Sequence, residues 1–151
     1  MQSFLNPPAT IRDCNECARL LVEQLGEHGV DASTERLSDL VEAVVANPDR
    51  GFVLLARVNE RIVGVAYAAT ILSAEHSGLV AWLEEVYVAT SYRSRGIGSA
   101  LLDAVLERAH EAGVVAVDLE VDASHNRAES LYRRMGFRPL NRSRWVKELI
   151  T

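Results

Sequence analysis

The segment Tyr92-Arg93-Ser94-Arg95-Gly96-Ile97-Gly98-Ser99 joins a predicted strand to a predicted helix and decides the fold. The apolar run before it, residues 79–88, is typical of a strand, and residues 97–112 have the spacing of an amphipathic helix. Glycine lets the backbone approach a ligand closely, and the first turn of a helix presents N–H groups without intrahelical partners. These groups, the helix dipole and the two arginines favour an anion. The segment therefore predicts a bound pyrophosphate on a phosphate-bearing cofactor.

The composition of the whole chain is that of a soluble globular protein. Its 151 residues fit one domain, expected to span residues 1–151, and the net charge of −5 argues against nucleic acid as a partner. No stretch approaches the roughly 20 apolar residues of a membrane span. The first residues lack the pattern of a signal peptide, so a cytoplasmic location is expected.

Strand and helix patterns alternate along the chain without a linker. Strands flanking the helix that follows the glycines would pair in parallel through a right-handed crossover, which predicts an α/β fold with a mixed sheet and helices on both faces. The patterns place strands at residues 9–12, 52–58, 62–72, 79–88, 114–121 and 145–150, and helices at residues 13–25, from a Ser33 cap to Asn47-Pro48, at residues 97–112 and at residues 128–135.

The glycine segment alone is weak support for a nucleotide site. It lacks the lysine of a P-loop, and Leu101 stands where the dinucleotide fingerprint has its third glycine. The alternative is a tight turn between strand and helix. However, Arg93 and Arg95 at a helix start are unfavourable for the dipole unless an anion binds there.

Two further features carry chemistry. Glu84 and Glu85 lie inside an apolar strand and Glu120 inside the next, and a carboxylate there is costly unless it is paired or solvated. One of Glu84 and Glu85 is expected to line a polar cleft, and the alternative is an exposed edge or a structural ion pair. Glu120 poses the same question. Tyr132, beside Leu131 in the last predicted helix, is either a packing tyrosine or a proton donor. Cys14 and Cys17 lack the further ligands of a zinc site and are expected to be free thiols.

With these features in place, residues 79–137 resemble the GNAT superfamily of acetyl-CoA-dependent N-acetyltransferases. The family's cofactor loop [RQ]-x-x-G-x-[GA] is matched by residues 93–98. Its signature N-x-x-A-x-x-L-Y-x-x-x-G-F is matched at Ala128, Leu131, Tyr132, Gly136 and Phe137. The signature's Asn falls on His125, and Asn126 stands one place later, so the resemblance leaves open which of the two contacts the pantetheine arm.

The resemblance implies a mostly antiparallel sheet in which the fourth and fifth strands, residues 79–88 and 114–121, are parallel and splay apart around pantetheine. Backbone groups of Val86 and Val88 would bind the pantetheine amides, and the N–H of Val86 or Tyr87 would act as the oxyanion donor. The remaining implied cofactor contacts come from the loop, at Arg93, Ser94, Arg95, Gly96, Ile97, Gly98 and Ser99.

The implied chemistry is attack of a primary amine on the acetyl-CoA thioester through a tetrahedral intermediate. A carboxylate removes the proton of the amine, and Tyr132 matches the general acid of the family. Residues 82–88 resemble the strand of spermidine/spermine N-acetyltransferases, which makes Glu84 the first candidate for the base. Glu120 matches the base of ribosomal-protein N-terminal acetyltransferases and ranks second, and Glu85 ranks third.

The acceptor expected from the sequence is a small primary amine, and the acidic residues fit a cationic one. A protein N-terminus or lysine is the alternative acceptor. A hypothesis of another class is a non-catalytic module that binds acyl-CoA, but the chain has candidates for both proton-transfer roles. The resemblance also implies a homodimer. No metal is expected, because the two cysteines lack the further ligands of a zinc site.

Overall fold

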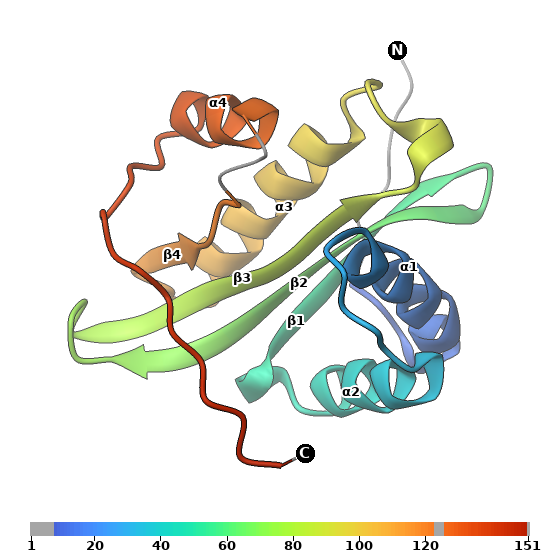
Figure 1. Ribbon diagram of the computed structural model, residues 1–151, viewed down its shortest axis with the longest axis horizontal. Coiled ribbons are helices and arrows are strands. Elements are labelled where there is room, and N and C mark those ends of the chain that lie inside the picture. The colour runs from blue at the N-terminus through green and yellow to red at the C-terminus, as the bar shows by residue number, and fades with distance from the viewer. Residues whose placement is uncertain (1–7, 123–125, 151) are drawn as a thin grey trace. The chain divides into compact units, whose positions relative to one another are not determined.

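The computed structural model describes residues 8–122 and 126–150, and the chain divides after Glu120 into two compact units (Figure 1). The first unit contains α1 (Cys14–Glu27), α2 (Thr34–Ala46), β1 (Gly51–Val58), β2 (Arg61–Ser73), β3 (Gly78–Val88), α3 (Ile97–Glu111) and β4 (Ala116–Leu119), with short 3-10 turns at Ile11–Asp13, Pro48–Arg50 and Thr90–Tyr92. The second unit contains α4 (Asn126–Arg134). Within the described residues, no helix is long and apolar enough to cross a membrane.

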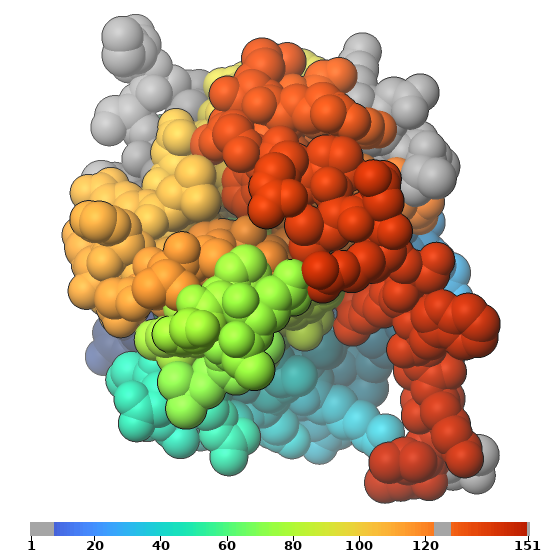
Figure 2. Space-filling model, turned by 90° about the vertical axis from the view of Figure 1, so that its left-hand side faces the viewer, coloured from blue at the N-terminus to red at the C-terminus, as the bar shows by residue number. Residues whose placement is uncertain are grey.

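The sheet of the first unit confirms the predicted mixed topology. Its strand order is β1-β2-β3-β4, with antiparallel pairing from β1 to β3 and parallel pairing between β3 and β4. The predicted hairpin is β1 and β2, and it turns at Asn59 and Glu60, whose φ values of 50° and 67° suit the twist of a tight hairpin. β2 and β3 extend beyond Gly51, the first residue of β1. Their connecting turn projects as the light green segment in Figure 2.

Helices cover both faces of this sheet (Figure 1). α1 and α2 pack on one face, where Leu21, Val41 and Leu55 belong to one buried apolar cluster. α3 packs on the other face, and its Leu101 lies so close to Gly64 of β2 that a Cβ added there would meet it at 3.0 Å. The residues buried along α3 form the predicted stripe, namely Ile97, Leu101, Leu102, Val105 and Ala109.

Two local predictions for the α1 and α2 region are confirmed. The Ser33 hydroxyl accepts a hydrogen bond from the Arg36 N–H, as expected of an N-cap, and α2 ends at Asn47. Cys14 and Cys17 are free and buried. Burial raises the pKa of Cys17 to about 12, so this thiol is protonated at neutral pH and is a poor nucleophile.

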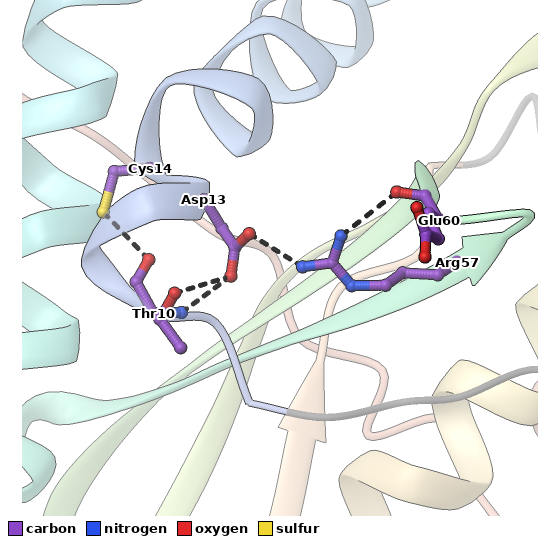
Figure 3. Close-up of polar contacts among 5 residues, drawn as sticks. All are labelled: Thr10, Asp13, Cys14, Arg57 and Glu60. Atoms are coloured by element: carbon purple, nitrogen blue, oxygen red, sulfur yellow. Dashed lines mark hydrogen bonds and ion pairs between the residues drawn. The ribbon is translucent and has the colours of Figure 1, made fainter.

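The strand predicted at residues 9–12 is wrong. Only Pro8 bridges Leu54, and the chain then turns into a 3-10 helix. The cause is Asp13, whose Oδ2 accepts hydrogen bonds from both the N–H and the hydroxyl of Thr10, while Arg57 of β1 binds its other oxygen at 2.7 Å (Figure 3). This contact closes the turn before a strand can extend.

The last two predicted strands also differ from the structure. The strand expected at residues 114–121 is shortened to Ala116–Leu119, because its pairing with β3 ends at Leu119. Residues 145–150 form no strand, and their apolar side chains are not buried: Trp145 and Ile150 are both 90% exposed. Apolar and β-branched composition favours a strand only where a sheet edge supplies hydrogen bonds, and the described sheet ends at β4.

Candidate active site

The pairing of β3 with the edge strand β4 covers only part of β3. Their parallel pairing runs from Val80 with Ala116 to Leu83 with Leu119, and among the described residues no strand pairs with β3 beyond Leu83 on that edge. The predicted divergence of these two strands is therefore present. Residues 84–88 of β3 form an open edge at which backbone groups can bind an extended ligand.

The direction of the backbone groups on this edge follows from the pairing with β2. Ala89 donates its N–H to the Val63 carbonyl, so the alternate residue Tyr87 also bonds toward β2. Val86 and Val88 alternate with these residues, so their N–H and C=O groups point away from β2, and the Val88 carbonyl accepts a hydrogen bond from Arg93 Nε at 2.9 Å. The N–H groups of both residues and the Val86 carbonyl are therefore the backbone groups on the open edge, and the N–H of Tyr87 is not among them.

A β-bulge in β3 places the two adjacent carboxylates. Tyr67 of β2 pairs with Glu85, whereas the next residue, Ala68, pairs with Leu83, so Glu84 is the extra residue. Burial raises the pKa of Tyr67 and the pKa of Glu85, and the charge of Glu84 raises both pKa values further. The bulge therefore gathers both carboxylates close to Tyr67 instead of leaving them on opposite faces of the sheet.

Glu85 is the carboxylate with the most altered environment. It is half-buried, and Gln24 of α1 donates a hydrogen bond from Nε2 to its Oε2. Burial raises the pKa of Glu85 to about 7, with a further increase from the charge of Glu84 and a smaller opposing effect of the Gln24 hydrogen bond. A carboxyl with a pKa near neutrality is suited to accept a proton at physiological pH.

The other two candidates for the base flank the beginning of the gap between the strands. Glu84 directly follows Leu83 on β3, and Glu120 directly follows Leu119 on β4, which are the last paired residues of the two strands. Both carboxylates are exposed. The structure thus brings all three predicted carboxylates to the region where pairing ends, with Glu85 alone half-buried there.

The glycine segment forms the expected turn into α3. Ser94 has φ 63° and Gly96 has φ 82°, so two residues of this short loop adopt left-handed backbone conformations. Gly96 is the residue before the first turn of α3, and a Cβ there would meet no atom within 4 Å, so its requirement for glycine is conformational. A Cβ at Gly98 would meet Val88 at 3.9 Å, an ordinary contact that fits the Gly-or-Ala position of the motif.

The amides that begin α3 point out of the helix end, as an anion site requires. α3 starts at Ile97, and Ala100 is bonded back to the Gly96 carbonyl, so the N–H groups at positions 97–99 precede the first intrahelical bond. Arg95 lies over the ring of Tyr92, with its guanidinium carbon 5.1 Å from the ring centre. A cation–π contact of this kind allows the guanidinium N–H groups to donate to an anion as well.

The remaining predicted site residues belong to the second unit. Tyr132 of α4 is half-buried, and its ring lies edge to face with Phe137 at 5.7 Å between the ring centres. Asn126 is the first residue of α4, and His125 lies outside the described residues.

The sequence motifs missed the contribution of α1. Glu23 and Glu27 of α1 both accept from the Tyr87 hydroxyl, at 3.2 and 3.4 Å, and Gln24 contacts Glu85. Burial raises the pKa of Tyr87, and the charges of Glu27 and Glu23 raise it further. The only signal in the sequence was the spacing of these polar residues, which puts them near one another at the end of one helix.

Comparisons with known proteins agree with this geometry. A family model described as the Acetyltransferase (GNAT) family matches residues 15–137, and the chain therefore belongs to this family. GNAT acetyltransferases use acetyl-CoA as co-substrate. The mycothiol acetyltransferase of Clavibacter sepedonicus is 34% identical over 110 residues, which are 64% of this chain and 36% of that protein. The chain thus spans little more than a third of that relative.

Solved structures share the fold over nearly the whole chain. A possible acetyltransferase from Clostridium difficile 630 has a TM-score of 0.84 at 19% identity and covers 99% of this chain and 100% of its own. A predicted acetyltransferase from Clostridium acetobutylicum, solved with acetyl-CoA, has a TM-score of 0.80 at 18% identity and covers 96% of both chains.

The raised pKa of Glu85 predicts a pH-dependent stability. Between its ordinary value of 4.5 and about 7, the folded protein holds a proton that the unfolded chain has lost, so the free energy of unfolding falls as the pH rises through this range. Glu85→Gln removes this cost. Relative to wild type, we expect the variant to gain on the order of 2 kcal/mol at about pH 8 and almost nothing at about pH 4.

Urea unfolding at the two pH values measures this gain. Glu35→Gln, an exposed carboxylate in the first turn of α2, is the matched control and should show no such trend. An equal effect of Glu85→Gln at both pH values would show that the Glu85 pKa is not raised.

Proposed function

We propose that this chain transfers the acetyl group of acetyl-CoA to a primary amine of a small molecule. The observation that carries the proposal is the open edge of β3 at residues 84–88, which is continuous with the left-handed loop and the exposed amides that begin α3. An extended pantetheine arm along the edge would place its pyrophosphate at these amides. The half-buried Glu85 precedes Val86 on the same strand, so a proton acceptor lies next to the proposed oxyanion donor.

The chemistry requires the acceptor to lose a proton before it attacks. An alkylamine has a pKa near ~10.4 and arrives as an ammonium ion at neutral pH. A carboxylate takes this proton, the amine nitrogen attacks the thioester carbonyl, and the Val86 N–H stabilises the oxyanion of the tetrahedral intermediate. The C–S bond then breaks, and we propose that Tyr132 supplies the proton to the departing thiolate.

Among the three carboxylates, the structure supports Glu85 as the base more strongly than its sequence ranking did. Its pKa of about 7 makes it half-ionised at neutral pH, and its contact with Gln24 fixes the direction of the carboxylate. Glu84 ranked first from the strand sequence, and as an exposed neighbour it would instead attract a cationic amine and keep the Glu85 pKa high. Glu120 stays the alternative base on the opposite side of the gap.

A small cationic amine is the proposed acceptor class. The carboxylates of Glu23, Glu27, Glu84 and Glu85 all belong to the α1 and β3 side of this site, and the likeness of residues 82–88 to spermidine/spermine N-acetyltransferases supports the same class. The name of the mycothiol acetyltransferase also refers to a small molecule. A protein N-terminus or lysine is the alternative acceptor.

Three further expectations stay proposals of the same kind: a homodimer, expected from the resemblance, and a cytoplasmic location and a single catalytic domain formed by both units, expected from the sequence. The last is supported by the family model, because its match at residues 15–137 spans the boundary after Glu120.

A panel of acceptors tests the proposed function. Release of the CoA thiol and the acetyl mass shift are measured with diamines, amino acids, N-terminal peptides and lysine peptides. We expect turnover with small cationic amines and little with peptides. Binding of acetyl-CoA without turnover on any amine would favour the non-catalytic module, and preference for peptides would favour the protein acceptor.

The pH dependence of kcat/KM with the best amine identifies the base. We expect Glu85→Gln to lose the ascending limb near pH ~7, because the variant has no carboxylate to deprotonate the acceptor. Glu84→Gln should keep this limb and shift it to lower pH, since removal of its charge lowers the Glu85 pKa. Loss of the limb in Glu84→Gln or Glu120→Gln alone would move the assignment to that residue.

Tyr132→Phe tests the general acid. The substitution retains the aromatic contact with Phe137 and removes only the hydroxyl. We expect kcat to fall by roughly tenfold or more, while the Kd for acetyl-CoA from calorimetry stays unchanged. Phe137→Leu, which removes the ring contact and retains the hydroxyl, is the companion variant. An unchanged kcat in Tyr132→Phe would exclude Tyr132 from the acid role.

A further inference from the structure

The side chain of Arg93, the first residue of the cofactor loop motif, is directed to the protein. Its Nε donates to the Val88 carbonyl at 2.9 Å, and its Nη2 contacts both carboxylate oxygens of Glu27 at 2.9 and 3.3 Å. Its guanidinium carbon lies 5.2 Å from the centre of the Tyr87 ring. Three separate elements, the end of β3, the loop and the last turn of α1, therefore meet at one guanidinium.

We propose that Arg93 is a positioning residue, which holds the cofactor loop against α1 through Glu27 and does not itself bind the pyrophosphate of acetyl-CoA. We call Glu27, Tyr87, Val88 and Arg93 the α1 bracket. The family motif permits an arginine or glutamine at this position, but only the longer, charged arginine can form an ion pair with Glu27. In this role Arg93 depends on a partner in α1, the carboxylate of Glu27.

The first argument for this role is that protein groups already accept hydrogen bonds from Arg93. Nε is used by the Val88 carbonyl and Nη2 by both oxygens of Glu27, and this ion pair partly offsets the charge of the guanidinium. The Tyr87 hydroxyl also donates to Glu27, which fixes the carboxylate from a second direction. Arg95, over the ring of Tyr92, is the cation of the loop that is better placed for the anion.

The second argument is the conformation of the loop. Ser94 and Gly96 both have positive φ, and the segment of residues 93–96 is exposed, so local packing provides little support. An anion site built from backbone amides binds well only if those amides are held in place before the ligand arrives. The Arg93 bond to Val88 is made directly after β3 and ties the start of this loop to the strand.

The consequence is a specific pattern of binding constants. If the bracket positions the loop, removal of Glu27 weakens CoA binding although Glu27 itself would touch no phosphate. If Arg93 instead binds the pyrophosphate directly, Glu27 competes with the ligand for the guanidinium. Removal of Glu27 would then leave CoA binding unchanged or make it tighter. The two roles of Arg93 therefore predict effects of opposite sign for one substitution.

A double-mutant cycle measures these effects. The Kd for CoA is determined by calorimetry for wild type, Glu27→Gln, Arg93→Gln and the double variant, and no acceptor is needed, so the result is independent of the amine. We expect each single variant to raise the Kd roughly three- to tenfold and the double variant to be no weaker than either single variant, because both remove one interaction. With an acceptor in hand, the KM for acetyl-CoA should rise by the same factor as the Kd for CoA.

Glu16→Gln is the matched control, because it makes the same charge change in the first turn of the same helix. Its Kd for CoA should equal that of wild type. Glu27→Ala is a second variant of the same side chain, and both Glu27 variants should keep the unfolding temperature of wild type, since Glu27 is 46% exposed. An unchanged or lower Kd in the Glu27 variants, with a raised Kd in Arg93→Gln, would overturn the proposal. Failure of wild type to bind CoA would instead contradict the proposed function.

Discussion

The parallel ladder between β3 and β4 lasts for four residue pairs, and the site depends on its early end. Had the strands stayed paired, the N–H and C=O groups of Val86 and Val88 would be satisfied by β4 and could bind no ligand. Because the pairing ends after Leu83 and Leu119, these groups form an open edge, apart from the Val88 carbonyl, which accepts from Arg93. Glu84 and Glu120, the next residues on each strand, then flank the beginning of the gap.

The bulge at Glu84 determines what chemistry this edge can support. In a regular strand, Glu84 and Glu85 would point to opposite faces, and only one could reach the α1 side. The extra residue brings both carboxylates to the vicinity of Tyr67, where one is half-buried and the other exposed. Burial of Glu85 and, to a smaller extent, the charge of Glu84 raise the pKa of Glu85 to about 7. One backbone irregularity therefore accounts for both the position and the raised pKa of the proposed base.

Features fixed by neighbouring residues could be predicted from the sequence, and features fixed by distant contacts could not. The stripe of α3 and the Ser33 cap are local patterns, and the structure confirms them. The strand predicted at residues 9–12 failed because Asp13 is held by Arg57, 44 positions away. Glu85 ranked third for the same reason, because its partner Gln24 is 61 positions away and no motif includes it.

α1 connects the two functions of the site. Gln24 contacts the proposed base on β3, and Glu27, on the following turn of the same helix, holds the first residue of the cofactor loop. A displacement of α1 would therefore move the Glu85 carboxylate and the Arg93 guanidinium together. Because both contacts lie at the C-terminal end of one helix, the proposed base and the cofactor loop share one structural support. This helix lies outside the two sequence motifs, so the motifs alone do not describe the whole arrangement.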